Sequence, residues 1–160
     1  MKKLDLSINQ YNINGIIQIG SNVGELSEHY HNIGIHKVLW IDCTSENYSA
    51  LYETTRKFGM EQNYAFFDAS IIAFKEWWRK NISWCDIESY DMVYLSQTDN
   101  QKKTISGFEN LLGTIKLVYF ANGIENDCHM FMLENGYQIH EYKTSNTNHV
   151  YGECYYLKKS

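Results

Sequence analysis

The sequence predicts an α/β fold in which helices cover both faces of a mostly parallel β-sheet. Short apolar runs alternate with segments whose apolar residues recur every three or four positions. The runs are nearly continuous, as expected of strands buried on both faces. A chain of 160 residues, 44% of them hydrophobic, suits one domain with a substantial core. We therefore expect a single domain over residues 1–160, with residues 1–14 as a lead-in.

Seven strands are expected. Five come from the apolar runs Gly15–Gly20, Lys37–Asp42, Asn63–Asp68, Tyr90–Leu95 and Ile115–Phe120. Two more, Tyr137–Tyr142 and Val150–Leu157, flank the short polar segment "KTSNTNH". This last pair predicts a hairpin, and so an antiparallel edge on an otherwise parallel sheet.

Helices are expected between the strands. In the first of them, Val23, Leu26, Tyr30 and Ile33 form one apolar stripe that ends at Gly34. The same spacing predicts helices over Tyr48–Phe58, Ile71–Ile82, Ile105–Leu112 and Asn126–Asn135.

The turn after the first strand, "GSNVG" from Gly20 to Gly24, is rich in small residues. A ligand can contact the backbone of such a turn, and the N–H groups of the following helix stay free. The same glycines also serve a tight strand-to-helix turn that binds nothing. The turn alone leaves both interpretations open.

Acidic residues at two strand ends favour a nucleoside pocket. Asp42 lies about twenty residues after the glycine turn, where a carboxylate can accept hydrogen bonds from ribose hydroxyls. Asp68, after the third strand, is placed to contact an adenine amino group. Either residue can instead cap the helix that follows it.

Longer segments resemble the FkbM-type, S-adenosylmethionine (SAM)-dependent methyltransferases. "IIQIGSNVGE" resembles their first motif, and "VLWIDCTSENYSAL" resembles their second strand and helix. "YDMVYLSQTDNQKKTISGFENLLGTIKLVYF" follows the family order of strand, Asp-x-x-Gly-x-Glu segment, helix and strand. "LENGYQIHEY" and "VYGECYYLKK" resemble the closing hairpin. The likeness covers residues 14–159.

The resemblance implies a Rossmann-like class I methyltransferase sandwich, with a seven-stranded sheet of order 3-2-1-4-5-7-6 and the seventh strand antiparallel. It also implies SAM as cofactor and methyl transfer to a hydroxyl of a glycan or small molecule. The cofactor is expected at the carboxyl ends of strands one and four, the topological switch point. The residues expected to bind it are Gly20, Ser21, Asn22, Gly24, Glu25, Asp42, Asp68 and Ser96.

Several positions depart from the family pattern. Gln18 stands where the family has an acid that helps to hold the amino-acid part of the cofactor. The Asp, Gly and Glu of the fourth-strand segment are Ser96, Asp99 and Gln101, and the family lysine is Tyr94. Cofactor contact is therefore better supported than catalysis.

A catalytic base must then come from elsewhere. The residues that could replace it are Asp99, His129 and His149. Each also has a structural interpretation: Asp99 as a helix cap, His129 as a packed or solvent-facing helix residue, and His149 as part of a surface loop. No metal is expected, because Cys128 and His129 are adjacent and no pair has zinc-like spacing.

The composition of the chain bears on its binding partners and its location. A net charge of −5 without a Lys/Arg cluster argues against nucleic acid. No apolar segment approaches the length of a membrane span or a signal sequence, so we expect a cytoplasmic protein. The four cysteines are expected to be reduced and packed. With little chain beyond the core, a large acceptor, a second copy or a partner subunit is expected to complete the substrate site.

Two functions compete. One is a minimal methyltransferase acting on a hydroxyl. The other is a catalytically inactive methyltransferase fold that serves as a binding or assembly module, which the charge losses at Gln18, Ser96 and Gln101 favour. A dinucleotide-dependent oxidoreductase fits the closing hairpin less well.

Overall fold

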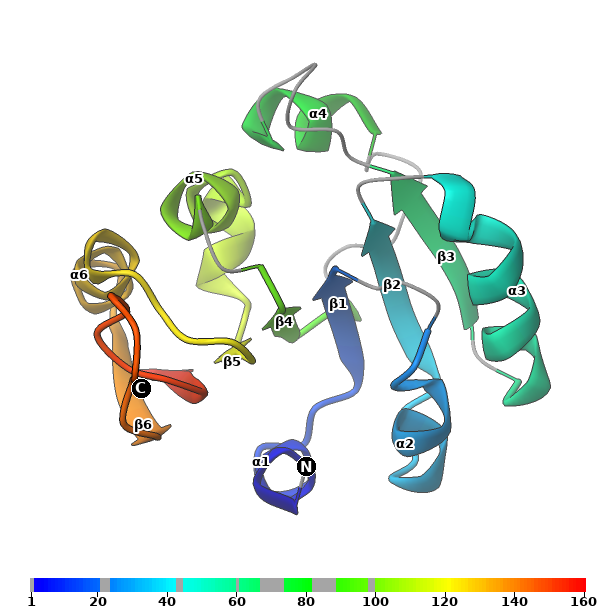
Figure 1. Cartoon of the computed structure of the whole chain (residues 1–160), viewed down its shortest axis with the longest axis horizontal. Coiled ribbons are helices and arrows are strands. Elements are labelled where there is room, and N and C mark those ends of the chain that lie inside the picture. The colour runs from blue at the N-terminus through cyan, green and yellow to red at the C-terminus, as the bar shows by residue number, and fades with distance from the viewer. Residues whose placement is uncertain are drawn as a thin grey trace.

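A seven-stranded sheet forms the centre of the computed structural model, which describes residues 2–20, 24–42, 45–59, 61–66, 74–81, 89–97 and 100–160 (Figure 1). The strand order is β3-β2-β1-β4-β5-β7-β6, as expected from the sequence. The strands are β1 (Gly15–Ile19), β2 (Lys37–Asp42), β3 (Glu61–Phe66), β4 (Met92–Leu95), β5 (Leu117–Phe120), β6 (Tyr137–Tyr142) and β7 (Cys154–Lys158).

Strand β1 lies at the centre of the parallel part of the sheet. It pairs in parallel with β2 on one side and with β4 on the other. The chain therefore leaves β1 toward β2 and β3, and returns to β4 on the opposite side. The carboxyl ends of β1 and β4 meet at this change of direction, which is where ligands bind in open α/β sheets.

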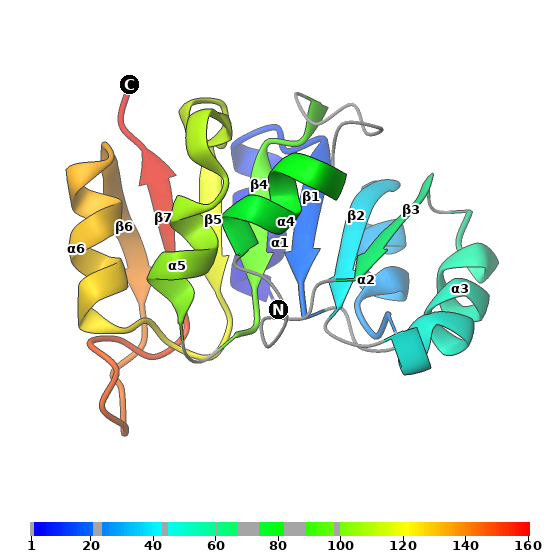
Figure 2. The same cartoon turned by 90° about the horizontal axis from the view of Figure 1, so that it is seen from above.

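Helices cover both faces of the sheet (Figures 1 and 2). One face is covered by α1 (Lys2–Gln10), α2 (Ser27–Asn32) and α3 (Tyr48–Lys57), which follows the 3₁₀ turn η1 (Ser45–Asn47). The other is covered by α4 (Phe74–Asn81), α5 (Gln101–Ser106) with the 3₁₀ turn η3 (Glu109–Gly113), and α6 (Asn126–Glu134).

Alternating strand residues supply two apolar cores. Ile17 and Ile19 of β1 enter the core beneath α4, α5 and α6. Ile16, one position away, enters the core beneath α1, α2 and α3. Because both faces are buried, β1 has no solvent-facing side, which explains its continuous apolar run.

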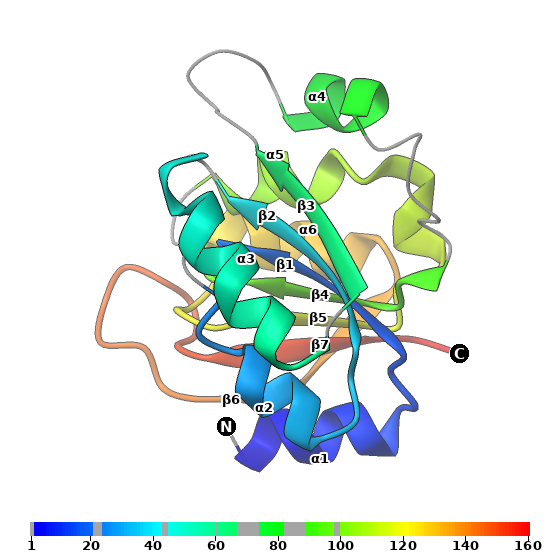
Figure 3. The same cartoon turned by 90° about the vertical axis from the view of Figure 1, so that its right-hand side faces the viewer.

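The carboxyl-terminal hairpin supplies the antiparallel edge. Strand β7 pairs antiparallel with both β5 and β6, and β6 is one of the two edge strands of the described sheet, opposite β3 (Figure 3). A bulge interrupts β6 between Ile139 and Glu141. The loop before β7 folds back onto the loop after β5, where Val150 N–H donates to Ile124 O at 2.9 Å and Ile124 N–H donates to Tyr151 O at 3.1 Å.

Some elements differ from the expectation. Residues 1–14 were expected to be a lead-in, yet Lys2–Gln10 form α1, whose Leu4 and Ile8 are buried against the sheet. Helix α5 begins at Gln101, several residues before the expected start of its apolar stripe. Strand β7 begins at Cys154, because the preceding residues turn to bond the loop after β5 instead of extending the ladder.

Asp91 joins three segments at the amino edge of the sheet. Its Oδ1 accepts from Asn14 N–H at 3.0 Å and from Gly15 N–H at 3.1 Å. Lys116 Nζ lies 3.2 Å from its Oδ2. Asp91 is buried, so this carboxylate fixes the starts of β1 and β5 beside its own position just before β4.

We predict that Asp91→Ala lowers the free energy of unfolding by about 3 kcal/mol, because it leaves two backbone N–H groups without their charged acceptor. Urea denaturation measures this. The control is Glu76→Ala, which removes an exposed ion pair with Lys80 and should change stability by no more than about 0.5 kcal/mol. Equal stability of the two variants would contradict the role assigned to Asp91.

Candidate functional site

The glycine turn lies at the carboxyl edge of the sheet, as predicted. Gly20 directly follows β1 with φ +84°, and its N–H donates to Ile41 O of β2 at 2.9 Å. Gly24 has φ +77° and begins the turn into α2. Both values lie in the left-handed region that favours glycine. Ser21 and Asn22 lie outside the described residues, so their cofactor contacts stay predictions.

Packing alone already requires both glycines. A Cβ at Gly20 would lie 1.9 Å from Ser96 Oγ. A Cβ at Gly24 would lie 2.9 Å from Leu51 Cδ1 of α3. These contacts support the ligand-free explanation of the turn, and a cofactor site needs further observations.

Ser96 joins the carboxyl ends of β1 and β4. Its Oγ donates to Ile19 O at 3.0 Å, and its N–H donates to the same carbonyl at 3.1 Å. Asn122 Nδ2, from the loop after β5, donates to Ser96 O at 2.7 Å. Ser96 thus lies where a cofactor contact was predicted, and its polar atoms also hold three segments together.

Asp42 lies beside the glycine turn. It is the last residue of β2, it is only 6% exposed, and it follows Ile41, the acceptor of the Gly20 N–H bond. The contact of Asp42 with a ribose stays a prediction. Glu25, directly after the turn, is exposed. Asp68 and Asp99 lie outside the described residues, so their predicted roles stay untested.

Gln18 is embedded in the core beneath α1, α2 and α3. Its side chain is 3% exposed, and its Oε1 accepts a hydrogen bond from Tyr30 Oη at 2.8 Å. Burial raises the pKa of Tyr30, so the phenol stays a neutral donor. The position where the family carries an acid therefore holds an uncharged amide–phenol pair. The apolar stripe identified Tyr30 only as a core residue. A polar amide at position 18, within an otherwise apolar strand, was the one sequence signal that a buried hydrogen-bond donor such as the Tyr30 hydroxyl lies nearby.

Gln101 links the loop after β4 to the loop after β5. Its side chain is 0% exposed. Its Nε2 donates to Gln97 O at 2.9 Å and to Gly123 O at 2.7 Å, while its Oε1 accepts from Glu125 N–H at 2.9 Å. Glu125 Oε1 in turn accepts from Gln101 N–H at 3.2 Å, at the start of α5. A carboxylate could not make the two donations, so the amide is required by this network.

His129 packs between α6 and β7. Its Nδ1 lies 2.6 Å from Tyr156 Oη, and its ring stands edge-on to Tyr151 at 5.5 Å. Burial lowers the pKa of His129, so it is neutral near pH 7. These contacts agree with the packed interpretation of this histidine.

His149 lies at the carboxyl edge of the sheet. Its ring is so close to the loop after β5 that a Cβ at Gly123 would meet its Cγ at 3.2 Å. Thr147 Oγ1 lies 2.8 Å from its Nδ1. The folded-back hairpin therefore brings His149 near the loop that Ser96 and Gln101 also contact.

A row of tyrosines crosses the sheet on the side of α1. Tyr94, Tyr119 and Tyr155 occupy matched positions on β4, β5 and β7. The Tyr94 and Tyr119 rings stack with centroids 5.3 Å apart, and Tyr119 and Tyr155 stack at 6.3 Å. Tyr94 therefore adds an aromatic ring beside the β1–β4 junction, where the family has a lysine.

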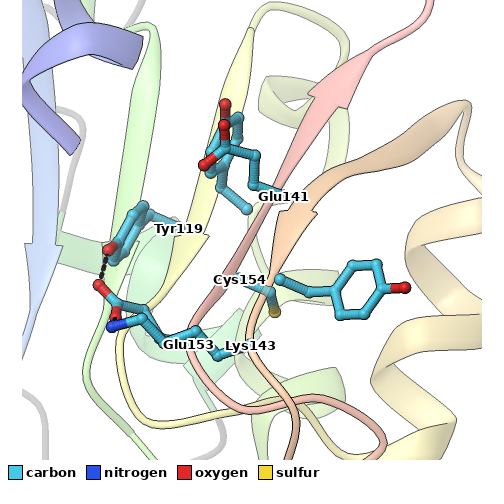
Figure 4. Close-up of a pocket in the computed structure, with 7 residues that line it drawn as sticks. Tyr119, Glu141, Lys143, Glu153 and Cys154 are labelled. Carbon is cyan, nitrogen blue, oxygen red and sulfur yellow. Dashed lines mark hydrogen bonds and ion pairs between the residues drawn. The ribbon is translucent and has the colours of Figure 1, made fainter. Parts of the chain in front are cut away.

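A hollow beside this row is too small for a nucleoside (Figure 4). Tyr119 Oη donates to Glu153, whose other oxygen pairs with Lys143. Burial acts to raise the pKa of Glu153, but the bonds from Lys143 and Tyr119 outweigh it, and the carboxyl pKa is lowered. The hollow measures about 10 Å³, which is room for about one water molecule.

Solved structures share this architecture. Magnesium protoporphyrin IX methyltransferase (ChlM) from Synechocystis PCC 6803, with bound SAH, superposes with a TM-score of 0.64 at 13% identity, over 99% of this chain and 81% of that one. A putative RNA methyltransferase, PH1948 from Pyrococcus horikoshii, gives 0.64 at 14% identity, over 98% and 80%.

The chain has a class I methyltransferase fold.

A third methyltransferase structure carries a ligand. TrmK from M. capricolum, in complex with its cofactor product S-adenosylhomocysteine, matches with a TM-score of 0.60 at 16% identity, over 95% of this chain and 67% of that one. No protein-family model matches the sequence, and no curated protein matches it. The methyltransferase fold is thus established by structure alone.

Two further observations concern the described part of the chain. It contains no helix long and apolar enough to cross a bilayer. Within it, no three His, Cys, Asp or Glu side chains gather in a way that could hold a metal ion.

We predict that Gly20→Ala destabilises the protein more than Gly34→Ala. Both glycines have φ +84°, so each substitution carries the same backbone strain of about 1–2 kcal/mol. Only Gly20 faces a side chain, since nothing lies within 4 Å of a Cβ at Gly34. The clash with Ser96 should add about 1–3 kcal/mol, as measured by urea denaturation.

The double variant Gly20→Ala/Ser96→Ala serves as the control. It removes the clashing Oγ and should recover most of the difference between the two single glycine variants. No recovery would show that Ser96 is not the reason for glycine at position 20.

Proposed function

We propose that this chain is a single methyltransferase domain that binds SAM at the carboxyl edge of the sheet and methylates a hydroxyl of a glycan or small-molecule acceptor. The observation that carries the proposal is Asp42, buried at the end of β2 beside the Gly20 turn. The methyltransferase fold supports the cofactor, since ChlM and TrmK structures carry SAM or SAH. The motifs quoted above support an FkbM-like subtype.

The residues at this edge fit an adenosyl group. The Asp42 carboxylate accepts hydrogen bonds from two ribose hydroxyls. The turn from Gly20 to Glu25 offers backbone to the rest of the cofactor, and Asp68 is assigned to the adenine amino group. When bound, SAM supplies an electrophilic methyl group, which carboxylates and ring faces such as that of Tyr94 favour through its positive charge.

The charge of the edge favours a neutral or cationic acceptor. Glu25, Asp42, Glu125 and Glu153 belong to this edge in the described chain. Lys143 beside them is paired with Glu153, while Lys102 and Lys103 are exposed in the first turn of α5. Phosphate backbones require unpaired basic residues. We therefore propose that the acceptor is not nucleic acid, although PH1948 is a putative RNA methyltransferase.

His149 is the base that we propose for the acceptor hydroxyl. It comes from the folded-back hairpin and lies against Gly123, next to the loop bonded to Ser96 and Gln101. His129 is engaged with Tyr156 and is the weaker choice. Methyl transfer depends strongly on alignment of donor and acceptor, so the base adds to the rate without being essential.

A catalytically inactive binding or assembly module is the second function. It is favoured by the two amides at positions where the family has acids: Gln18 is bonded to Tyr30, and Gln101 holds two loops together. A second copy or a partner subunit would then contact the same edge. The free, buried thiols of Cys128 and Cys154 accord with a reducing compartment, and we propose the cytoplasm.

We predict that S-adenosylhomocysteine binds the full chain with a Kd below about 1 mM and that Asp42→Asn weakens it about 10- to 100-fold, the effect of losing charge-assisted hydrogen bonds. Calorimetry measures both. Glu46→Gln, an exposed acid in η1 after the same strand, is the matched control and should leave the affinity unchanged. A wild-type Kd above about 1 mM would contradict the proposal that this protein binds the cofactor. An unchanged Kd in Asp42→Asn would refute the assignment of Asp42 to the ribose.

We predict that His149→Gln lowers kcat about 10²- to 10⁴-fold while the Kd for S-adenosylhomocysteine stays unchanged. The assay follows methyl transfer from labelled SAM to a set of monosaccharides and catechols. His140→Gln, an exposed histidine on β6, is the control and should keep full turnover. Cofactor binding without methyl transfer in the wild type would favour the inactive module.

A further inference from the structure

Two histidines lie together at the amino edge of the sheet, opposite the candidate cofactor site. His31 is in the last turn of α2, and His36 directly precedes β2. Both side chains are exposed. Neither residue has a role in the fold core or in the proposed methyl transfer.

The backbone between them is fixed. Gly34, with φ +84°, reverses the chain after α2, and its N–H donates to His31 O at 3.1 Å. Ile35 is buried, and its N–H donates to Tyr30 O at 2.8 Å. The turn therefore holds the two histidine backbones in one arrangement.

The ring geometry suits one shared ion. The centroids of His31 and His36 are 5.3 Å apart, at an interplanar angle of 76°. Two imidazoles that bind one tetrahedral ion at about 2.0–2.1 Å have centroids about 5 Å apart. On its other side, His31 contacts the Phe58 ring at 5.6 Å, which limits its freedom.

In contrast to the expectation of no metal site, we propose that His31 and His36, which are separated by four residues, together bind one divalent transition-metal ion, with Zn²⁺ as the representative. Imidazole is a preferred ligand of Zn²⁺, Cu²⁺ and Ni²⁺. The carboxyl end of α2 carries partial negative charge, which favours a cation there. No three-ligand group occurs in the described residues, so water completes the coordination.

The ion would join the end of α2 to the start of β2 across the Gly34 turn. A ligand that binds only the folded chain raises its stability with the logarithm of its concentration over Kd. This inference does not rest on SAM binding, because the pair lies at the opposite edge of the sheet.

Calorimetric titration of Zn²⁺ into the full chain tests the proposal. We expect one ion bound with a Kd below 1 mM, and a loss of affinity of at least about tenfold in both His31→Ala and His36→Ala. His140→Ala, which removes an exposed histidine elsewhere, should keep the wild-type affinity. Mg²⁺, which requires oxygen ligands, should not bind at this site.

A measurement on the wild-type protein distinguishes loss of the metal site from unfolding of the variants. Paramagnetic Ni²⁺ should broaden the imidazole NMR signals of His31 and His36 before those of the other histidines. Zn²⁺ affinity weaker than 1 mM, equal affinity in the His31→Ala/His36→Ala variant, or broadening of other histidines first would each overturn the proposal.

Discussion

The close approach of β1 and β4 at their carboxyl ends determines which residue can follow β1 and where the chain turns at that edge of the sheet. Ser96 reaches under the chain to the Ile19 carbonyl and fills the space where a side chain on Gly20 would lie. Position 20 therefore accepts only glycine. The turn that begins at Gly20 lies beside the end of β2, where Asp42 is buried. The backbone shape of this turn thus follows from strand packing alone, and the proposed cofactor site depends in addition on Asp42.

At two positions where the resembled family has acids, this protein has the amides Gln18 and Gln101, and both form hydrogen bonds within the protein. The Gln18 amide accepts from the buried phenol of Tyr30, and the Gln101 amide holds two loops that a carboxylate could not hold. A buried amide needs hydrogen-bond partners but no counter-charge, and both Gln18 and Gln101 have such partners in this structure. The two amides therefore leave the proposed function to other polar residues, the buried Asp42 and the less buried Glu25 and His149.

The strands, both helical layers and the position of Asp42 at a strand end could be predicted, because apolar periodicity is a local pattern. The strand order was predicted from the family resemblance. Helix α1 was predictable in principle: Leu4, Ser7 and Ile8 recur at helical spacing and are buried. The role of Gln101 could not be predicted, because two of its partners, Gly123 and Glu125, lie more than twenty residues away in the loop after β5. His149 was a candidate base from the sequence, but its position beside the loop after β5 could not be predicted, because it depends on the hairpin folding back onto Ile124.

The bulge in β6 has a consequence for how the molecule behaves at high concentration. An edge strand offers unpaired backbone groups to any extended chain that meets it. Between Ile139 and Glu141 the ladder loses its regular register, so a foreign strand could match only one half of β6 at a time. The bulge therefore disfavours pairing of β6 with strands of other copies of the chain, and so disfavours the growth of fibres from this edge.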